Sequence, residues 1–355
     1  MLFAVAKGEQ RATITACSAP LGFSFGSSLQ APKVMSRMVG LRPFRRHGFR
    51  IGLERHGGKT IVHHYGHGGS GVTLSWGTSA EVISILKANG LAKGLRVAVL
   101  GCGAVGLATA YRLMEAGYLA TIYSKDAVLR TTSAVAGARI YPSLLIDSDK
   151  LTEEFEILCR KALSSSVHMF TSLVGERYGV RWHPVFYRFD QLPTLAWEDV
   201  LAAKFFPEPR PTGSRSQLFK SSMAGCDHGL FVDMPVYLNA ILNDLCANGI
   251  KVVRREVSSV DDLQLFEEDC VINCMGLGAS SLGKLDMIPI RGQAVILEAA
   301  DIHPKLAIED GGFYLYPRGR KILIGGGADV GSSSTTYDII QERKILNRLQ
   351  AIIAS

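Results

Sequence analysis

Residues 96–126 read RVAVLGCGAVGLATAYRLMEAGYLATIYSKD, and this stretch decides the fold. The aliphatic run that ends at Leu100 is typical of a buried parallel strand. Good helix formers fill 107–116, Gly117 follows as a helix stop, and 119–123 reads as a second strand. A strand, a glycine-rich turn, a helix and a second strand in this order predict an α/β protein with a Rossmann-type sheet.

The glycine-rich turn has the spacing G-x-G-x-x-G. Its first glycine allows a tight turn, its second lets the backbone approach a pyrophosphate, and its third lets the helix pack closely on the sheet. Phosphates would lie at the helix N-terminus, where free N–H groups and the helix dipole favour anions. The pattern predicts a dinucleotide site made by Gly101, Cys102, Gly103, Ala104, Val105 and Gly106. A glycine-rich turn without a ligand is the alternative.

The acidic residue that usually binds the ribose after the second strand is displaced in this sequence. Lys125 stands near the expected position, and Asp126 is its neighbour. We therefore expect the ribose end of the dinucleotide near Ser124, Lys125 and Asp126. The sequence leaves the exact ribose contact open.

Composition narrows the class of protein. The chain has 355 residues, of which 47% are hydrophobic, enough for two domains or one large α/β unit. The net charge is +7, and basic residues concentrate in 37–55, where Phe44 and Phe49 are the aromatic residues. An anion-binding site or a solvated face fits this run better than nucleic-acid binding does. We expect no nucleic-acid partner.

The cysteines and apolar segments predict a cytoplasmic location. Seven cysteines occur without C-x-x-C pairing, which favours reduced thiols. No apolar run reaches the length of a membrane helix, and the first residues, which include Glu9, lack the apolar core of a signal peptide. We expect no membrane partner. A metal is not expected either, because the adjacent His63 and His64 would point to opposite faces of a strand, with His67 nearby.

The remaining patterns predict a second domain with a mostly antiparallel sheet. Runs with strand character at 34–65 include a hairpin turn at Gly57-Gly58, and further strands are expected across 291–330. The expected nucleotide-binding domain comprises 56–150 and 226–284. The expected substrate domain comprises 151–225, 285–355 and about 30–55, and 1–29 is expected to be irregular.

Several motifs together resemble the D-amino-acid oxidase family of FAD-dependent oxidoreductases, which includes D-aspartate oxidase. They are VAVLGCGAVGLATA, TTSAVAGARIYP, KVVRREVSSV, VINCMGLGASSL, RGQAVILEA, FYLYP with ILIGGG, VGLRP and HHYGHGGSGVTLSWG. In the family the VGLRP and YGHGG motifs close the chain, whereas here they precede the dinucleotide motif. The resemblance implies FAD as cofactor and a circular permutation joined through 80–94, with new ends near Ser355 and Pro32. Fragments arranged in tandem, or two half-domains, are the alternative.

The resemblance also implies roles for individual residues. Arg42 in VGLRP matches an arginine that binds the substrate carboxylate beside the flavin, and Tyr314 matches a tyrosine that hydrogen-bonds the same group. These two are the candidate catalytic residues, with Tyr316 as a second contributor. A structural ion pair for Arg42 and packed strand aromatics for the tyrosines are the alternatives. The other implied cofactor positions are Gly68, Gly69, Gly71, Val72, Thr73, Thr131, Thr132, Ala136, Gly137, Val257 and Gly276; Gly69 is also a candidate substrate contact.

The implied activity is oxidation of a D-amino acid to its imino acid by hydride transfer to the flavin, with no catalytic base. O₂ would reoxidise the flavin and give H₂O₂, and the imino acid would hydrolyse to a keto acid and ammonia. The partners are thus a small-molecule amino acid and O₂; a homodimer is compatible with the sequence. The alternatives are a related oxidase or dehydrogenase of glycine, a secondary amine or a cyclic imino acid, and a catalytically silent ligand-binding protein.

One basic residue, Arg139, and two acidic residues, Glu309 and Asp310, bear on the choice of substrate. Arg139 takes the place of an aromatic or apolar family residue near the flavin, and it could alter substrate choice or form a salt bridge. Glu309 stands about where D-aspartate oxidases carry an arginine for the second substrate carboxylate, with Asp310 beside it. Glu309 as a substrate contact predicts a neutral or basic D-amino acid. The alternative is that Glu309 and Asp310 solvate a turn.

Overall fold

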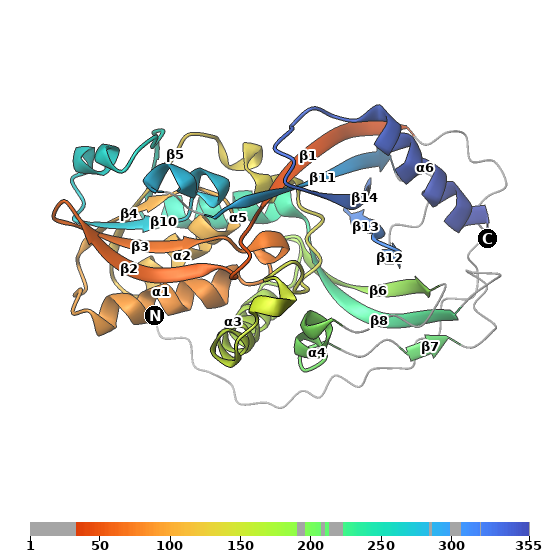
Figure 1. The fold of residues 1–355 in the computed structure, drawn as a ribbon, viewed down its shortest axis with the longest axis horizontal. Helices are drawn as coiled ribbons and strands as arrows, with labels where there is room; N and C mark the ends of the chain where they lie inside the picture. Colours follow the sequence, from red (N-terminus) through yellow and green to blue (C-terminus); the bar gives the residue numbers. More distant parts are fainter. Residues whose placement is uncertain are drawn as a thin grey trace.

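The structure is a computed structural model that describes residues 33–189, 196–206, 210–212, 223–283, 286–298, 307–319 and 321–354. The predicted irregular segment 1–29 lies outside the described residues. Two sheets form the frame of the molecule (Figure 1). The predicted α/β class, with a Rossmann-type sheet and a second, mostly antiparallel sheet, is confirmed.

The six-stranded sheet has the order β2-β3-β10-β4-β5-β9. Its strands are β2 (Arg50–His56), β3 (Lys59–Tyr65), β4 (Arg96–Leu100), β5 (Leu119–Ser124), β9 (Lys251–Arg254) and β10 (Cys270–Asn273). All neighbours run parallel except β2, which forms an antiparallel hairpin with β3. The central strands β4 and β10 are almost wholly apolar and buried, as strands covered on both faces must be.

Helices cover this sheet. They are α1 (Ser75–Ala88), α2 (Ala104–Glu115) and α5 (Met234–Ala247), and α3 (Glu153–Ser172) packs against α1. Short 3-10 turns lie at Gly68–Ser70, Val128–Arg130, Thr132–Val135, Ser148–Lys150, Asp261–Leu265 and Gly276–Leu282. The fully buried side chains of Trp76, Leu107, Leu113 and Ile122 belong to one core between the helices and the strands.

The eight-stranded sheet has the order β1-β11-β14-β13-β12-β6-β8-β7, and only the β12–β6 pair is parallel. Its strands are β1 (Val34–Phe44), β6 (Val180–Phe189), β7 (Arg210–Thr212), β8 (Met223–Val232), β11 (Ile288–Glu298), β12 (Ala307–Asp310), β13 (Phe313–Arg318) and β14 (Lys321–Val330). Helix α6 (Ile339–Ala354) packs on β13 and β14, and the short α4 (Trp197–Ala202) lies near α3 in Figure 1.

Residues 34–95 contribute to both sheets. Strand β1 pairs along β11, whereas β3 lies beside β10, far away in the sequence. From α1 the chain passes through Gly90 and Gly94 directly into β4. At the other end, Arg37 of β1 hydrogen-bonds Glu342 of α6, with Nη2 to Oε1 at 3.0 Å. This contact meets the spatial expectation for a circular permutation, but tandem fragments would place the same segments together. The permutation therefore stays a prediction.

The sheets divide the chain differently from the expected domain boundaries at two points. The boundary at 55–56 falls within β2, which pairs with β3 in the six-stranded sheet. The boundary at 226 falls within β8, which pairs with β6 in the eight-stranded sheet. The strand pairing does not itself divide the chain into domains, so the domain boundaries stay a prediction.

Candidate active site

A single cavity of about 1240 Å³ runs between the two sheets. At one end it is bounded by the glycine turn between β4 and α2, and at the other by β12 and β13. Every predicted cofactor and substrate residue except Gly106 lines this cavity. Those that do are Arg42, Gly68, Gly69, Gly71, Val72, Thr73, Gly101, Cys102, Gly103, Ala104, Val105, Ser124, Lys125, Asp126, Thr131, Thr132, Ala136, Gly137, Val257, Gly276, Glu309, Tyr314 and Tyr316.

The glycine turn has the geometry that its spacing predicts. Gly101 has φ +105°, and a Cβ there would lie 2.7 Å from the carbonyl oxygen of Cys274. A Cβ on Gly106 would lie only 2.0 Å from the carbonyl oxygen of Gly101, so this glycine serves the close packing of α2 on the sheet. Gly103 precedes the first residue of α2 in extended backbone and opens onto the cavity. The turn thus presents a helix N-terminus and bare backbone to the cavity, which suits a pyrophosphate.

Ser133 was not among the predicted cofactor positions, although it lines the cavity. Its Oγ accepts a hydrogen bond from the N–H of Ala104 at 3.0 Å. A loop residue thereby fixes the start of α2 from across the cavity. At the ribose end, Lys125 faces Glu256 at 3.9 Å, and Asp126 is exposed. Glu256 also lines the cavity. This carboxylate follows β9 and so lies outside the unit formed by β4, α2 and β5.

The loop 68–73 is clamped against the segment 141–144. Ser70 Oγ donates to the carbonyl oxygen of Ser143 at 2.8 Å, and Thr73 Oγ1 donates to that of Tyr141 at 3.0 Å. A Cβ on Gly68 would lie 1.8 Å from the carbonyl oxygen of Leu144, so only glycine fits. The N–H of Gly69 is directed at the same carbonyl, 3.4 Å away. The loop leads directly into α1, whose dipole makes its beginning favourable for negative charge.

The side chains of His64 and His67 are buried beneath this loop. His67 stacks on Phe49 with ring centroids 5.0 Å apart and contacts Thr78 Oγ1 at 3.3 Å. Burial lowers the pKa of His67 to about 3 and that of His64 well below its usual value, so both rings are neutral. His63 points elsewhere, toward Glu54 at 3.1 Å. Within the described part of the chain, no cluster of His, Cys, Asp or Glu has an arrangement that could hold a metal.

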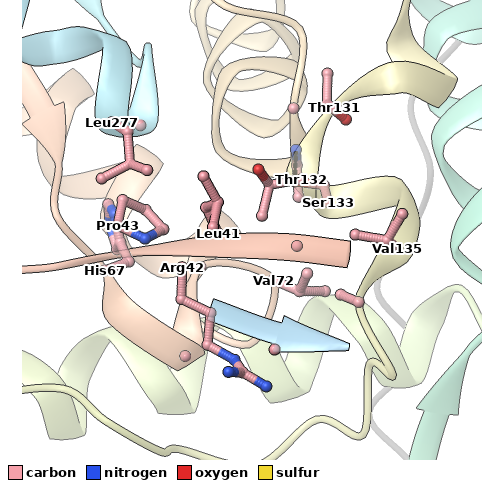
Figure 2. A pocket seen from close by; sticks show the side chains of 18 of the residues that line it. Leu41, Arg42, Pro43, His67, Val72, Thr131, Thr132, Ser133, Val135 and Leu277 are labelled. Carbon is pink, nitrogen blue, oxygen red and sulfur yellow. Dashed lines mark hydrogen bonds between the residues drawn. The ribbon is translucent and has the colours of Figure 1, made fainter. Parts of the chain in front are cut away.

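Arg42 belongs to β1, and it lines the cavity. Figure 2 shows its side chain on the opposite side of β1 from Leu41 and Pro43, as strand alternation requires. Its guanidinium lies over Gly292 of β11, where a Cβ would come within 2.7 Å of both terminal nitrogens. The Nη1 atom is buried and has no hydrogen-bond partner among the described residues. No ion pair to Arg42 occurs among the residues that the structure describes, and the unpartnered Nη1 suits a ligand carboxylate.

Tyr314 has a similar arrangement on β13. Its hydroxyl lies over Gly325 of β14, where a Cβ would be 2.3 Å from the oxygen. Burial raises the pKa of Tyr314, so the phenol keeps its proton at neutral pH and remains a hydrogen-bond donor. Strands β11 and β14 lie between β1 and β13 in the sheet. Arg42 of β1 extends over Gly292 of β11, and Tyr314 of β13 extends over Gly325 of β14. Tyr316 stacks on Tyr314 with centroids 4.5 Å apart.

Arg139 forms salt bridges with two carboxylates. Its Nη1 donates to Glu309 Oε1 at 2.9 Å and its Nη2 to Asp227 Oδ2 at 3.2 Å. Tyr316 donates to the same Glu309 oxygen, and Tyr187 donates to Asp227 at 2.6 Å. Burial opposes the charge of Arg139, but Glu309 and the other neighbours raise its pKa well above the usual value. Asp310, on the other face of β12, pairs with Arg348.

These contacts answer two questions that the sequence left open. Arg139 forms a salt bridge, and the bridge includes Glu309. The interpretation of Glu309 and Asp310 as residues that solvate a turn is wrong, because both side chains are engaged in ion pairs on β12 and Asp310 is buried. Sequence reasoning missed Tyr187 and Asp227, which belong to β6 and β8 and come close to Arg139 only in the folded sheet.

Comparisons with known proteins agree with this geometry. The family described as FAD dependent oxidoreductase (DAO) matches residues 96–355. A D-amino-acid oxidase of Rubrobacter xylanophilus is 30% identical over 267 residues, covering 72% of this chain and 77% of the relative. The human D-aspartate oxidase is 26% identical over 264 residues, covering 72% and 75%.

Among solved structures, iminodiacetate oxidase from Chelativorans sp. BNC1 has a TM-score of 0.56 at 15% identity and covers 73% of this chain and 79% of its own. Glycine oxidase from Bacillus cereus has a TM-score of 0.54 at 16% identity, with 73% and 78% covered. At this identity the likeness shows the fold alone. No helix in the described ranges is long and apolar enough to cross a membrane. With its glycine turn, paired sheets and the match over residues 96–355, this chain belongs to the DAO family of FAD-dependent oxidoreductases.

Proposed function

We propose that this protein oxidises a D-amino acid to its imino acid, with FAD as the hydride acceptor and O₂ as the final electron acceptor. The observation that carries the proposal is the buried, unpartnered Nη1 of Arg42 in the cavity that the glycine turn also lines. A buried N–H donor without a hydrogen-bond partner is costly unless a ligand pairs with it. An α-carboxylate is the planar anion that fits it.

The residues of the chain bind and orient in this proposal. Arg42 holds the substrate carboxylate through paired N–H donors, and Tyr314 donates a further hydrogen bond to it. The turn from Gly101 to Gly106 holds the pyrophosphate of FAD, and the loop 68–73 with the beginning of α1 favours negative charge at the flavin ring. FAD supplies the redox chemistry, and the protein supplies position and electrostatics. No side chain is assigned as a base, because the amine binds neutral and the hydride leaves from the α-carbon.

Flavin absorbance tests the proposal directly. The purified protein should be yellow, and anaerobic addition of D-alanine or D-norleucine should bleach the flavin bands. The matched L-amino acids should not, and readmitted air should restore the colour with formation of H₂O₂. Bleaching by glycine, sarcosine or D-proline alone would show the related amine oxidase instead. A flavin-loaded protein that none of these compounds bleaches would overturn both readings and leave a silent binding protein.

A further inference from the structure

The far wall of the cavity is a row of side chains across the eight-stranded sheet. Strand register pairs Tyr314 of β13 with Glu309 of β12, and Glu309 with Tyr187 of β6. Residues paired in register point to the same face of a sheet. All three line the cavity. The row therefore begins at the proposed carboxylate site and continues away from it, along the direction in which a substrate side chain would extend.

Glu309 has one oxygen engaged and one available. Its Oε1 accepts hydrogen bonds from both Arg139 and Tyr316. Its Oε2 has no hydrogen bond to any described residue, and the side chain is 27% exposed in a residue that lines the cavity. Two donors on one oxygen fix the carboxylate group, so the second oxygen is held in place as an acceptor. An acceptor fixed in this way loses little entropy when it binds a donor.

The charges around Glu309 favour a cation. Arg139 is only 5% exposed and is shared between Glu309 and Asp227, so this wall contains two carboxylates for one guanidinium. The guanidinium of Arg139 also lies over the ring of Tyr187, 5.4 Å from its centroid. Two other charged groups near the row, within the described part of the chain, have partners of opposite charge: Arg318 faces Asp233 at 3.4 Å, and Asp310 pairs with Arg348. An anionic side chain would meet Glu309 first, because its charge is the exposed one.

The distance across the sheet from the proposed carboxylate site to Glu309 sets the length of the substrate side chain that can bind both. The hydroxyl of Tyr314 lies over β14, and Glu309 belongs to β12, two strands further on. Strands are about 4.8 Å apart, so the carboxylate site and Glu309 are separated by about 10 Å. The four-carbon stem of lysine, followed by a hydrogen bond of about 2.8 Å, spans this interval. The methyl group of alanine does not reach it.

We propose that Glu309, held by Arg139 and Tyr316, selects D-amino acids whose long side chain ends in a cation, such as D-lysine and D-arginine. This inference rests on the proposed function, because it uses the carboxylate site at Arg42 as its origin. Glu309 acts here as a specificity residue and takes no part in hydride transfer. Arg139 is a positioning residue that acts through Glu309.

Substrate pairs of equal length isolate the effect. We expect kcat/KM for D-lysine to exceed that for D-norleucine, which lacks only the ammonium group, by about 10- to 100-fold, the range for one hydrogen bond to a charged group. D-arginine should exceed D-citrulline in the same way, and D-glutamate should be the poorest substrate of similar length. Turnover of D-norleucine reports the proposed function, and the ratio of D-lysine to D-norleucine reports the inference. Turnover without a preference for D-lysine would overturn the inference alone.

The variant Glu309→Gln removes the charge and keeps an acceptor for Arg139 and Tyr316. The ratio of kcat/KM for D-lysine to that for D-norleucine should fall toward one, because the ammonium group of D-lysine loses its charged partner. Glu298→Gln, which removes an exposed carboxylate at the end of β11 outside the cavity, is the matched control and should leave the ratio unchanged. An unchanged ratio in Glu309→Gln would refute the assignment. If that variant loses its flavin, the wild-type ratios still decide: a D-lysine to D-norleucine ratio of one or less, or a preference for D-glutamate, overturns the inference.

Discussion

Mild acid should destabilise the fold through His64 and His67, the two histidines buried beneath the loop 68–73. His64 and His67 are fully or almost fully buried, and their rings meet edge to face with centroids 5.1 Å apart. Burial is the main reason that both pKa values are lowered, and for His64 the proximity of His67 adds to it. Protonating either ring would place a charge in an apolar site beside another ring that cannot share it.

The magnitude follows from proton linkage. In the unfolded chain a histidine has a pKa of about 6.5, whereas in the folded protein that of His67 is about 3. At pH 5 the unfolded state therefore binds a proton that the native state does not. His67 then costs about 1.5 pH units multiplied by 1.36 kcal/mol, or about 2 kcal/mol, and the lowered pKa of His64 adds to this cost in the same direction. This stability is fully present above pH 6.5 and is lost as the pH falls toward the folded pKa values.

Urea unfolding at pH 7 and pH 5, followed by tryptophan fluorescence at saturating FAD, measures this loss. The double variant His64→Gln, His67→Gln should be less stable at pH 7 but should lose at least about 2 kcal/mol less than the wild type between the two pH values. His56→Gln, at an exposed residue of the β2–β3 hairpin, is the control and should behave as the wild type does. Carboxylates of ordinary pKa remain mostly ionised at pH 5, so they contribute little to the difference. Equal losses in the wild type and the double variant would refute the reasoning.

Three further variants test the cavity, and a rearranged chain tests the order of the sequence. Gly292→Ala places a Cβ within 2.7 Å of the guanidinium of Arg42, so KM should rise by at least about tenfold while bound FAD, measured by absorbance, is retained. Arg42→Leu should raise KM more steeply, since losing one partner of a closed charge pair costs about 2–5 kcal/mol, and it too should keep its flavin; an unchanged kcat/KM would remove Arg42 from the site. Gly103→Val should lose FAD and keep its circular dichroism spectrum, and a yellow variant would contradict the phosphate assignment. A chain that starts at Arg96 and carries residues 33–95 after its C-terminus should bind FAD if the natural order is a permutation, whereas residues 96–355 alone should not.

The nucleotide half of the site could be read from the sequence because its determinants are local. The glycines at 101, 103 and 106 lie within one turn: Gly101 has a positive φ, Gly106 packs against the carbonyl oxygen of Gly101, and Gly103 opens onto the cavity. The position of Ser133 was less accessible, since its hydroxyl meets the N–H of Ala104 only through tertiary folding. The sheet to which a strand belongs is likewise hard to predict, because strands β2 and β8 take their places through pairing with neighbours in the sheets.

The substrate half depends on contacts between distant strands. Arg139 and Glu309 are separated by 170 positions, so the sequence shows two opposite charges but not their pairing. Glycines within the strands are a sequence signal that could have indicated where the substrate site lies on the eight-stranded sheet. A glycine inside a strand weakens it and often marks the close approach of another group. Gly292 in β11 and Gly325 in β14 stand under the polar ends of Arg42 and Tyr314. Arg42 of β1 and Tyr314 of β13 can lie over β11 and β14 because these two strands have glycines at the contact positions. The binding surface therefore forms where the middle strands of the sheet lack side chains.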